Sequence, residues 1–188
     1  EFFFRSCPMC GSQSSNDVDK FHNLYSIVSC NVCMAHYVNP CPPLNALEDY
    51  YNNSSCNTLF SDLLRSRHKT KNSIISDRTQ QVVELILAKA SQKETVRVLE
   101  IGCNSGMFLS ELKTALKSVN PDFSYDLIGI DIDHNSINSK VDNDLNLYCS
   151  SVEDFLLDES QEKFDLVLHF ELVEHLADPY NFFQNVFS

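Results

Sequence analysis

Apolar and polar residues follow two different periods in the second half of the chain. Four short apolar runs have the length of buried strands, and they span residues 96–101, 127–133, 145–149 and 164–170. Between them, apolar residues recur at helical spacing, as at Leu109, Leu112 and Leu116. Buried strands that alternate with helices are typical of parallel sheets. The pattern therefore predicts an α/β domain over residues 93–188.

The segment before this domain is predicted to be helical. Apolar residues recur every three or four positions from Ile74 to Ala90, which predicts a helix beside the first strand. Residues 44–51 read as a shorter helix that follows a proline-rich end of the N-terminal module. We therefore expect residues 44–92 to form a helical linker or lid.

The first apolar run ends in an acid and a loop with two glycines, in the spacing E-x-G-x-x-x-G. Glycine has no Cβ, so Gly102 and Gly106 allow the backbone to approach a ligand closely. Glu100 ends the strand, and open α/β sheets bind their ligands at the carboxyl ends of strands. The spacing differs from the G-x-G-x-x-G of nicotinamide-dinucleotide sites. The alternative is an ordinary strand-turn-helix without a ligand.

The second apolar run also ends in an acid. A carboxylate in this position can accept hydrogen bonds from both hydroxyls of a ribose, which makes Asp131 a candidate ribose ligand. The alternative is a loop acid in water. Asp133, two residues later, is predicted to cap the helix that begins at His134.

Together, these residues resemble the motifs of the class I S-adenosylmethionine-dependent methyltransferases. The resemblance implies a Rossmann-like sheet whose first loop holds the amino-acid end of the cofactor. Asn104 replaces the usual middle glycine, and asparagine is the residue besides glycine that best tolerates a left-handed backbone. Residues 150–155 match the motif beside the adenine ring, with Ser151 in place of the usual aspartate. The implied cofactor contacts are Glu100, Gly102, Cys103, Asn104, Gly106, Asp131, Ile132, Val152, Glu153 and Phe170.

The sheet of this family normally has seven strands, whereas four are readable here. An exposed sheet edge is hard to keep soluble. We therefore expect the carboxyl-terminal strands to be absent from this chain and the domain to be incomplete.

The string E-x-x-E-H follows the fourth strand. Residues at positions i, i+3 and i+4 share one face of a helical turn, so Glu171, Glu174 and His175 are expected to lie together. Similar strings occur in quinone-pathway and small-RNA methyltransferases. Glu174 and His175 are the candidate catalytic residues, because a neutral imidazole near pH 7 can remove a proton from a hydroxyl acceptor. The alternatives are a divalent-metal site, or hydrogen bonds that only fix the loop.

Cysteines occur near the N-terminus as two C-x-x-C pairs with nineteen residues between them. Two such pairs supply the four thiolates of a tetrahedral zinc site. Four thiolates leave no open position for a substrate, so the metal is expected to be structural. The spacing predicts a zinc ribbon over residues 1–43, with a short strand over residues 24–29, and the ligands Cys7, Cys10, Cys30 and Cys33. Two disulfides or a redox pair are the alternatives.

The composition of the chain limits the classes of molecule that it is expected to bind. The formal net charge is −12, which disfavours nucleic acid, and no apolar run reaches the ~18 residues of a membrane span. The one modest basic cluster covers residues 65–71. We expect a cytoplasmic enzyme that transfers methyl groups from S-adenosylmethionine to a small-molecule acceptor, such as a sugar-nucleotide or quinone intermediate. The alternatives are a non-catalytic cofactor- and partner-binding module, and an RNA 2′-O-methyltransferase.

Overall fold

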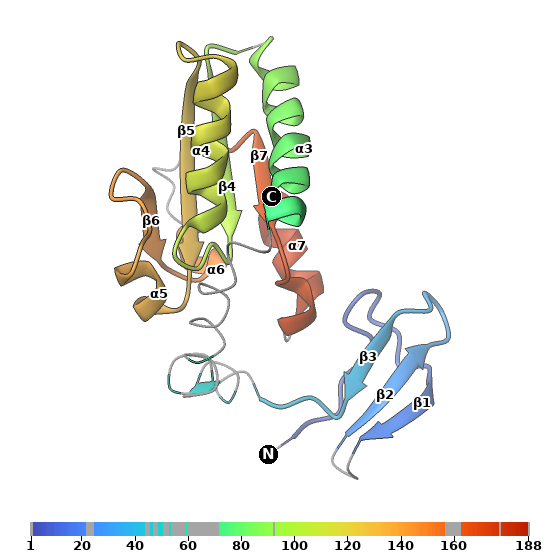
Figure 1. The fold of residues 1–188 in the computed structure, drawn as a ribbon. Coiled ribbons are helices and arrows are strands. Elements are labelled where there is room, and N and C mark those ends of the chain that lie inside the picture. The colour runs from blue at the N-terminus through green and yellow to red at the C-terminus, as the bar shows by residue number, and fades with distance from the viewer. Residues whose placement is uncertain are drawn as a thin grey trace. The chain divides into compact units, whose positions relative to one another are not determined.

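The computed structural model describes most of the chain as two compact units (Figure 1). One unit comprises residues 1–53 and 173–188, and the other comprises residues 54–172. The described residues are 2–21, 25–43, 46, 49–50, 53, 59, 72–91, 93–156, 163–176 and 178–187. About half of the predicted linker lies outside them, including most of the helix expected over residues 44–51 and the basic cluster over residues 65–71.

The first unit contains a three-stranded antiparallel sheet in the order β1-β2-β3. Its strands are β1 (Ser15–Phe21), β2 (Tyr25–Cys30) and β3 (His36–Asn39). The predicted strand over residues 24–29 is confirmed for its described part. The same unit includes the 3-10 helix η1 (Val173–His175) and α7 (Pro179–Phe187), which begins with a proline, a residue favoured in the first turn of a helix.

The second unit is an α/β domain whose four strands are all parallel, in the order β6-β5-β4-β7. This confirms the predicted Rossmann-like sheet preceded by a small cysteine-bearing module. Its elements are α3 (Asn72–Ala90), β4 (Thr95–Ile101), α4 (Met107–Val119), β5 (Ser124–Asp131), α5 (His134–Asn138), β6 (Asn146–Cys149), α6 (Val152–Leu156) and β7 (Leu166–His169).

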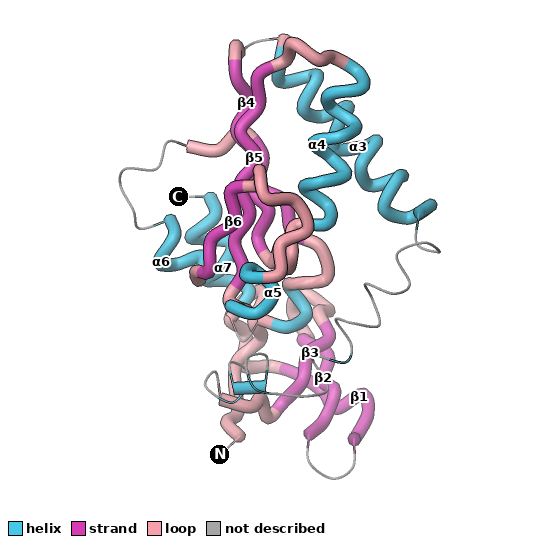
Figure 2. The backbone as a smooth tube through the Cα atoms, turned by 60° about the vertical axis from the view of Figure 1, so that its left-hand side comes forward, coloured by secondary structure: helices cyan, strands magenta, loops and turns pink. Residues whose placement is uncertain are grey.

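The core of the α/β domain lies between the sheet and two helices. Figures 1 and 2 show α3 and α4 side by side, and Figure 2 shows α6 on the other side of the sheet. The two central strands, β4 and β5, are buried because helices cover them, which explains their continuous apolar runs. The central core side chains are Val82, Ile86, Val96, Val98, Leu109, Leu112 and Leu116.

The strand order places the candidate site. β4 pairs with β5 on one side and with β7 on the other. The strands that follow β4 are therefore added first on the β5 side and later on the opposite side, which makes β4 a topological switch point. Ligands of open α/β sheets bind outside the carboxyl ends of the strands at this kind of switch point. Glu100, near the carboxyl end of β4, and Asp131, the last residue of β5, both belong to that edge.

Several element boundaries differ from the sequence prediction. The second strand ends at Asp131 and not at Asp133, because the Asp131 carboxylate accepts a hydrogen bond from the Asp133 N–H and turns the chain. Asp133 then caps α5, as expected, by accepting from the Asn135 N–H at 2.9 Å. The fourth strand is confined to Leu166–His169, within the predicted run of residues 164–170.

Gly129 is a packing requirement that the sequence analysis did not identify. A Cβ on this residue of β5 would lie 2.7 Å from both Cys103 Sγ and Leu147 Cδ2. Real Cβ atoms do not approach so closely, so any larger side chain would displace the loop that follows β4. The glycine thus allows that loop to pack directly on the neighbouring strand.

None of the helices formed by the described residues combines the length and the apolar character that crossing a lipid bilayer requires.

Candidate functional site

The loop between β4 and α4 is built from left-handed turns. Gly102, Asn104 and Gly106 have φ angles of 76°, 52° and 77°, a region that L side chains other than asparagine rarely adopt. The expectation that Asn104 tolerates a left-handed backbone is confirmed. The Gly102 and Cys103 N–H groups both donate to the Ile130 carbonyl, at 2.9 and 3.1 Å. These bonds fix the loop to the carboxyl end of β5.

Asn104 also uses its side chain to hold the loop. Its Oδ1 accepts a hydrogen bond from the Ser105 N–H at 2.8 Å, and its own N–H donates to Asp131 Oδ2 at 2.8 Å. A glycine in this position could make only the backbone contact. The substitution of the usual glycine therefore leaves the turn intact and adds a bond to it.

Both loop glycines are enclosed by leucine side chains. A Cβ on Gly106 would lie 2.9 Å from Leu145 Cδ1 and from Leu147 Cδ1, and one on Gly102 would lie 3.3 Å from Leu172 Cδ1. Side chains are therefore unfavourable at these positions because of both the backbone angle and the limited space.

Glu100 is the most unusual residue of the edge. Its side chain is 4% exposed, and Oε2 has no hydrogen-bond partner among the described residues. Burial, with a smaller contribution from the nearby Asp131 charge, raises the pKa of Glu100 well above its ordinary value. A buried acceptor without a partner is costly in an isolated protein. It fits a ligand that brings a donor or a positive charge, such as an ammonium group.

Asp131 lies within electrostatic reach of Glu100 and is held rigidly. Oδ1 accepts from the Asp133 N–H at 2.8 Å, and Oδ2 accepts from the Asn104 N–H. Burial raises the pKa of Asp131, although these backbone bonds oppose the shift. Each carboxylate oxygen has a second lone pair, so Asp131 can still accept two hydroxyl groups. The exposed apolar side chain of Ile132 follows directly.

The segment after β6 is positioned by the same edge. The Ser150 N–H donates to the Asp131 carbonyl at 3.0 Å. Ser151 Oγ accepts from the Asp154 N–H and donates to the Asp154 carboxylate, so this serine caps α6. Its side chain is therefore engaged within the chain. Val152 is buried and Glu153 is exposed, and their contacts with a cofactor stay predictions.

An aromatic and charged cluster lies at the end of β7. Phe170 packs on Phe108 with ring centroids 4.7 Å apart, and the Arg78 guanidinium lies 5.0 Å from the Phe170 centroid. Arg78 also pairs with Glu171 Oε1 at 2.8 Å, and Glu171 itself has a φ of 50°. A non-glycine residue with this φ is a local strain of the kind found at ligand sites. The sequence analysis missed Arg78, because nothing in the helix pattern distinguishes it.

Glu174 and His175 lie in the 3-10 helix η1, in the other compact unit. His175 Nε2 is 3.9 Å from Glu174 Oε1, and both side chains are about half exposed. That distance permits an ion pair when the histidine is protonated but exceeds a hydrogen bond. Their catalytic role stays a prediction.

The four predicted cysteine ligands do come together. All four sulfur atoms lie within 4.8 Å of one another, and Cys7–Cys33 and Cys10–Cys30 are each 3.6 Å apart. Four sulfurs at 2.3 Å from a central zinc would be about 3.8 Å apart in a tetrahedron. The cluster could therefore hold a metal ion. None of the four forms a disulfide, which argues against that alternative.

The environment of the cluster favours the thiolate form of Cys30, whereas contacts with the neighbouring thiols raise the pKa of Cys10 and of Cys33. Backbone N–H groups of Cys33 and Val32 point at the Cys30 sulfur and lower the pKa of Cys30 to about 6. His36 is exposed on β3 and does not belong to the cluster. Cys41 is buried separately, where its backbone forms a bridge with Phe3.

The parallel sheet, the glycine loop and the acidic strand ends have the arrangement of α/β domains that bind ligands at a switch point. Comparison with protein families matches residues 73–188 to the methyltransferase-domain family. Because the match covers more than half of the chain, this protein belongs to that family.

Solved structures show the same fold. The plantazolicin methyltransferase BpumL in complex with SAH has 20% identity and a TM-score of 0.53, over 75% of this chain and 51% of its own. The plantazolicin methyltransferase BamL, in complex with a triazolic desmethylPZN analog and SAH, has 19% identity and a TM-score of 0.53, over 76% and 50%. This chain thus spans about half the length of both enzymes. No curated protein matches it significantly.

Zinc analysis tests the cysteine cluster. Protein purified without added metal should contain about one zinc per chain, because four converging thiolates bind zinc tightly. Cys30→Ser should lose most of the metal and unfold the ribbon, measured by elemental analysis and circular dichroism. Cys41→Ala is the matched control, since Cys41 is equally buried but lies outside the cluster; it should retain the zinc. Metal-free protein with a folded ribbon would contradict the assignment.

The buried Glu100 carboxyl predicts a pH dependence. Because its pKa is raised in the folded state, the folded protein binds this proton more tightly than the unfolded chain does. Stability should therefore fall as the pH rises above the ordinary glutamate pKa. Glu100→Gln removes this loss and should raise the melting temperature of ligand-free protein at pH 7–8 relative to wild type. Glu153→Gln, at an exposed position, should leave the curve unchanged. Identical wild-type and Glu100→Gln curves would contradict the prediction.

Proposed function

We propose that this protein binds S-adenosylmethionine at the carboxyl edge of its parallel sheet and transfers the methyl group to a small-molecule acceptor. The observation that carries the proposal is the buried, unpartnered Glu100 carboxylate beside a left-handed glycine loop and the Asp131 carboxylate. Two acids placed this close together destabilise the ligand-free protein. They suit a ligand that carries an ammonium group at one end and ribose hydroxyls in the middle, because both groups can donate hydrogen bonds to carboxylates.

The residues fit the parts of this cofactor in order along the sheet edge. Glu100 would accept from the amino group, and the loop of Gly102, Cys103, Asn104 and Gly106 would enclose the amino-acid end. Asp131 would accept from the ribose, with Ile132, Val152 and Glu153 beside the adenine and Phe170 beside the methionine part. When bound, the sulfonium supplies an electrophilic methyl group, and the protein's task is to align an acceptor with it.

The negative charge of the chain favours a small-molecule methyl acceptor over a nucleic acid. The formal net charge of −12 opposes phosphate backbones, which argues against an RNA substrate. BamL is described in complex with a triazolic desmethylPZN analog and SAH, so a neighbour with this fold binds such a molecule together with SAH. We infer an acceptor of biosynthetic type, such as a sugar-nucleotide or a quinone intermediate.

The cysteine cluster is proposed to hold a structural zinc ion. Its unit has a small core, formed by Cys7, Val28, Cys30 and Tyr37 with Ala35 packed against it. Domains of this size rarely fold on a hydrophobic core alone, and a metal bond supplies the missing stabilisation. Four thiolates complete the coordination, so the ion would take no part in methyl transfer.

His175 is proposed as the general base and Glu174 as its partner. A hydroxyl acceptor must lose its proton as the methyl group arrives, and an imidazole can take it near pH 7. The 3.9 Å separation allows Glu174 to stabilise the protonated imidazole.

Binding measurements test the cofactor site. Asp131→Ala should weaken binding of S-adenosylhomocysteine by roughly 1.5–3 kcal/mol, the range for hydrogen bonds to a charged group. Calorimetry on the full-length protein gives the affinity. Asp133→Asn is the matched control. It removes a negative charge only two residues from Asp131, and asparagine can still cap the helix, so the affinity should stay close to that of wild type. Unchanged affinity in Asp131→Ala would place the ribose elsewhere, and no binding by wild type would overturn the proposed function.

Kinetics test the base. His175→Ala should lower kcat by ~10²–10⁴ while the cofactor dissociation constant stays nearly constant. A residue that only fixes the loop would instead lower stability or cofactor affinity. Turnover within a few-fold of wild type would show that the enzyme works by positioning alone, and cofactor binding without turnover on any acceptor would favour a binding module.

A further inference from the structure

The loop between α5 and β6 supports the glycine loop from outside. The Val141 N–H donates to the Ser105 carbonyl at 3.0 Å. Four residues later, Leu145 Cδ1 fills the space into which a Cβ on Gly106 would extend. Residues 141–145 therefore contact the glycine loop at its centre and at the start of α4.

Ser105 depends on this support. Its side chain is fully buried, and its hydroxyl has no hydrogen-bond partner among the described residues. Its N–H is bound to the Asn104 side chain, within the same loop. The bond from Val141 to the Ser105 carbonyl thus joins the glycine loop to a segment more than thirty residues away in sequence.

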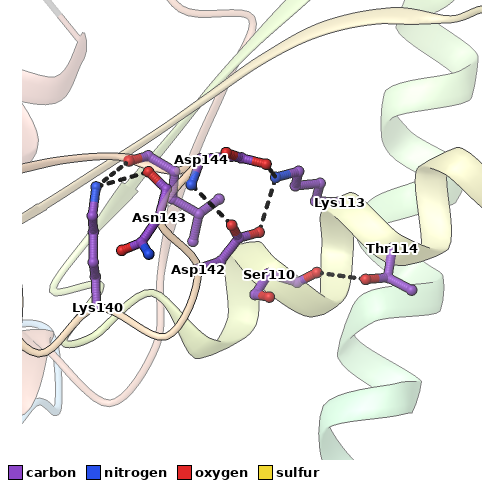
Figure 3. A network of polar contacts seen from close by, with 8 residues as sticks. Ser110, Lys113, Thr114, Lys140, Asp142, Asn143 and Asp144 are labelled. Atoms are coloured by element: carbon purple, nitrogen blue, oxygen red, sulfur yellow. Dashed lines mark hydrogen bonds and ion pairs between the residues drawn. The ribbon is translucent and has the colours of Figure 1, made fainter.

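Two lysines hold the supporting loop (Figure 3). Lys113 of α4 extends its Nζ to Asp142 Oδ2 at 2.9 Å and to Asp144 Oδ2 at 3.3 Å. Lys140 Nζ donates to the carbonyls of Asn143 and Leu145, at 3.0 and 3.3 Å. Asp142 also accepts from the Asp144 N–H at 2.9 Å, which closes a tight turn.

The two acids do not contribute equally. The side chains of Lys113 and Asp142 are only 16% and 23% exposed, whereas that of Asp144 is 84% exposed. An exposed ion pair adds little, and a sheltered one adds more. The hydrogen bond to Lys113 lowers the pKa of Asp142, and the one to Asp142 raises the pKa of Lys113, so both groups stay charged over the physiological range.

We propose that Lys113 is a positioning residue for cofactor binding, which acts through Asp142 to keep the Val141 N–H on the Ser105 carbonyl. This inference rests on the proposed function, because the glycine loop is its target. Lys113 does not belong to the predicted set of cofactor contacts. Lys113 keeps the glycine loop ordered before the ligand binds. Without it, binding must also order the loop, and this entropic cost lowers the affinity for the ligand.

The test compares charge variants of the same lysine. Lys113→Met keeps the aliphatic stem and should weaken S-adenosylhomocysteine binding about tenfold, within the usual range for coupling between residues and a remote ligand. Hydrogen exchange at the Val141 N–H should accelerate in the same variant. Lys113→Arg should restore both, and Asp144→Asn, which removes only the exposed partner, should change neither.

The outcomes separate this inference from the proposed function. Wild-type binding with unchanged affinity in Lys113→Met would overturn the positioning role and leave the function standing. Failure of wild type to bind would overturn the function itself. If Lys113→Met does not fold, Asp142→Asn removes the same charge pair with a smaller change, and wild-type affinity in that variant would overturn the inference.

Discussion

The organisation of the α/β domain depends on one tight turn, in which the N–H groups of Gly102 and Cys103 share the carbonyl of Ile130. This pair of bonds ties the end of β4 to the end of β5 and forces the next residues into left-handed angles. Gly129 makes the arrangement sterically feasible, because the Cys103 side chain packs where a Cβ would be. The acids at the ends of both strands are brought together as a consequence.

Burying the Glu100 and Asp131 carboxyl groups near each other is energetically unfavourable, and burial is the main cause of their raised pKa values. Glu100 is buried without a hydrogen-bond partner among the described residues, and Asp131 accepts hydrogen bonds from two backbone N–H groups. Burial disfavours the charged form of both, so the ligand-free protein stores an unfavourable interaction. A ligand that supplies donors and positive charge would relieve it. On the proposed function, stability of the ligand-free protein is exchanged for affinity, which is common at binding sites.

The N-terminal ribbon lacks a large hydrophobic core, and we propose that a bound metal ion stabilises it. Its apolar residues are too few for a substantial core, and several of them, including Val32 and Met34, are exposed. Two of the converging cysteines, Cys7 and Cys30, belong to the small core, and the other two, Cys10 and Cys33, are exposed. A metal bond there would stabilise the unit without any demand on the rest of the chain.

Local patterns were sufficient for much of this description. The strand and helix periods, the C-x-x-C pairs, the Asp133 cap and the left-handed Asn104 all follow from residues close in sequence, because backbone preference, capping and side-chain period are local properties. The family resemblance added the Rossmann-like sheet and the expected cofactor contacts, and the order of the strands came from the structure. Contacts between distant segments were not readable in this way. Arg78 with Glu171, Lys113 with Asp142, and the space required at Gly129 exist only after the sheet has formed. The same holds for the missing partner of Glu100, since burial depends on what the whole domain packs around a residue and not on its neighbours in the chain.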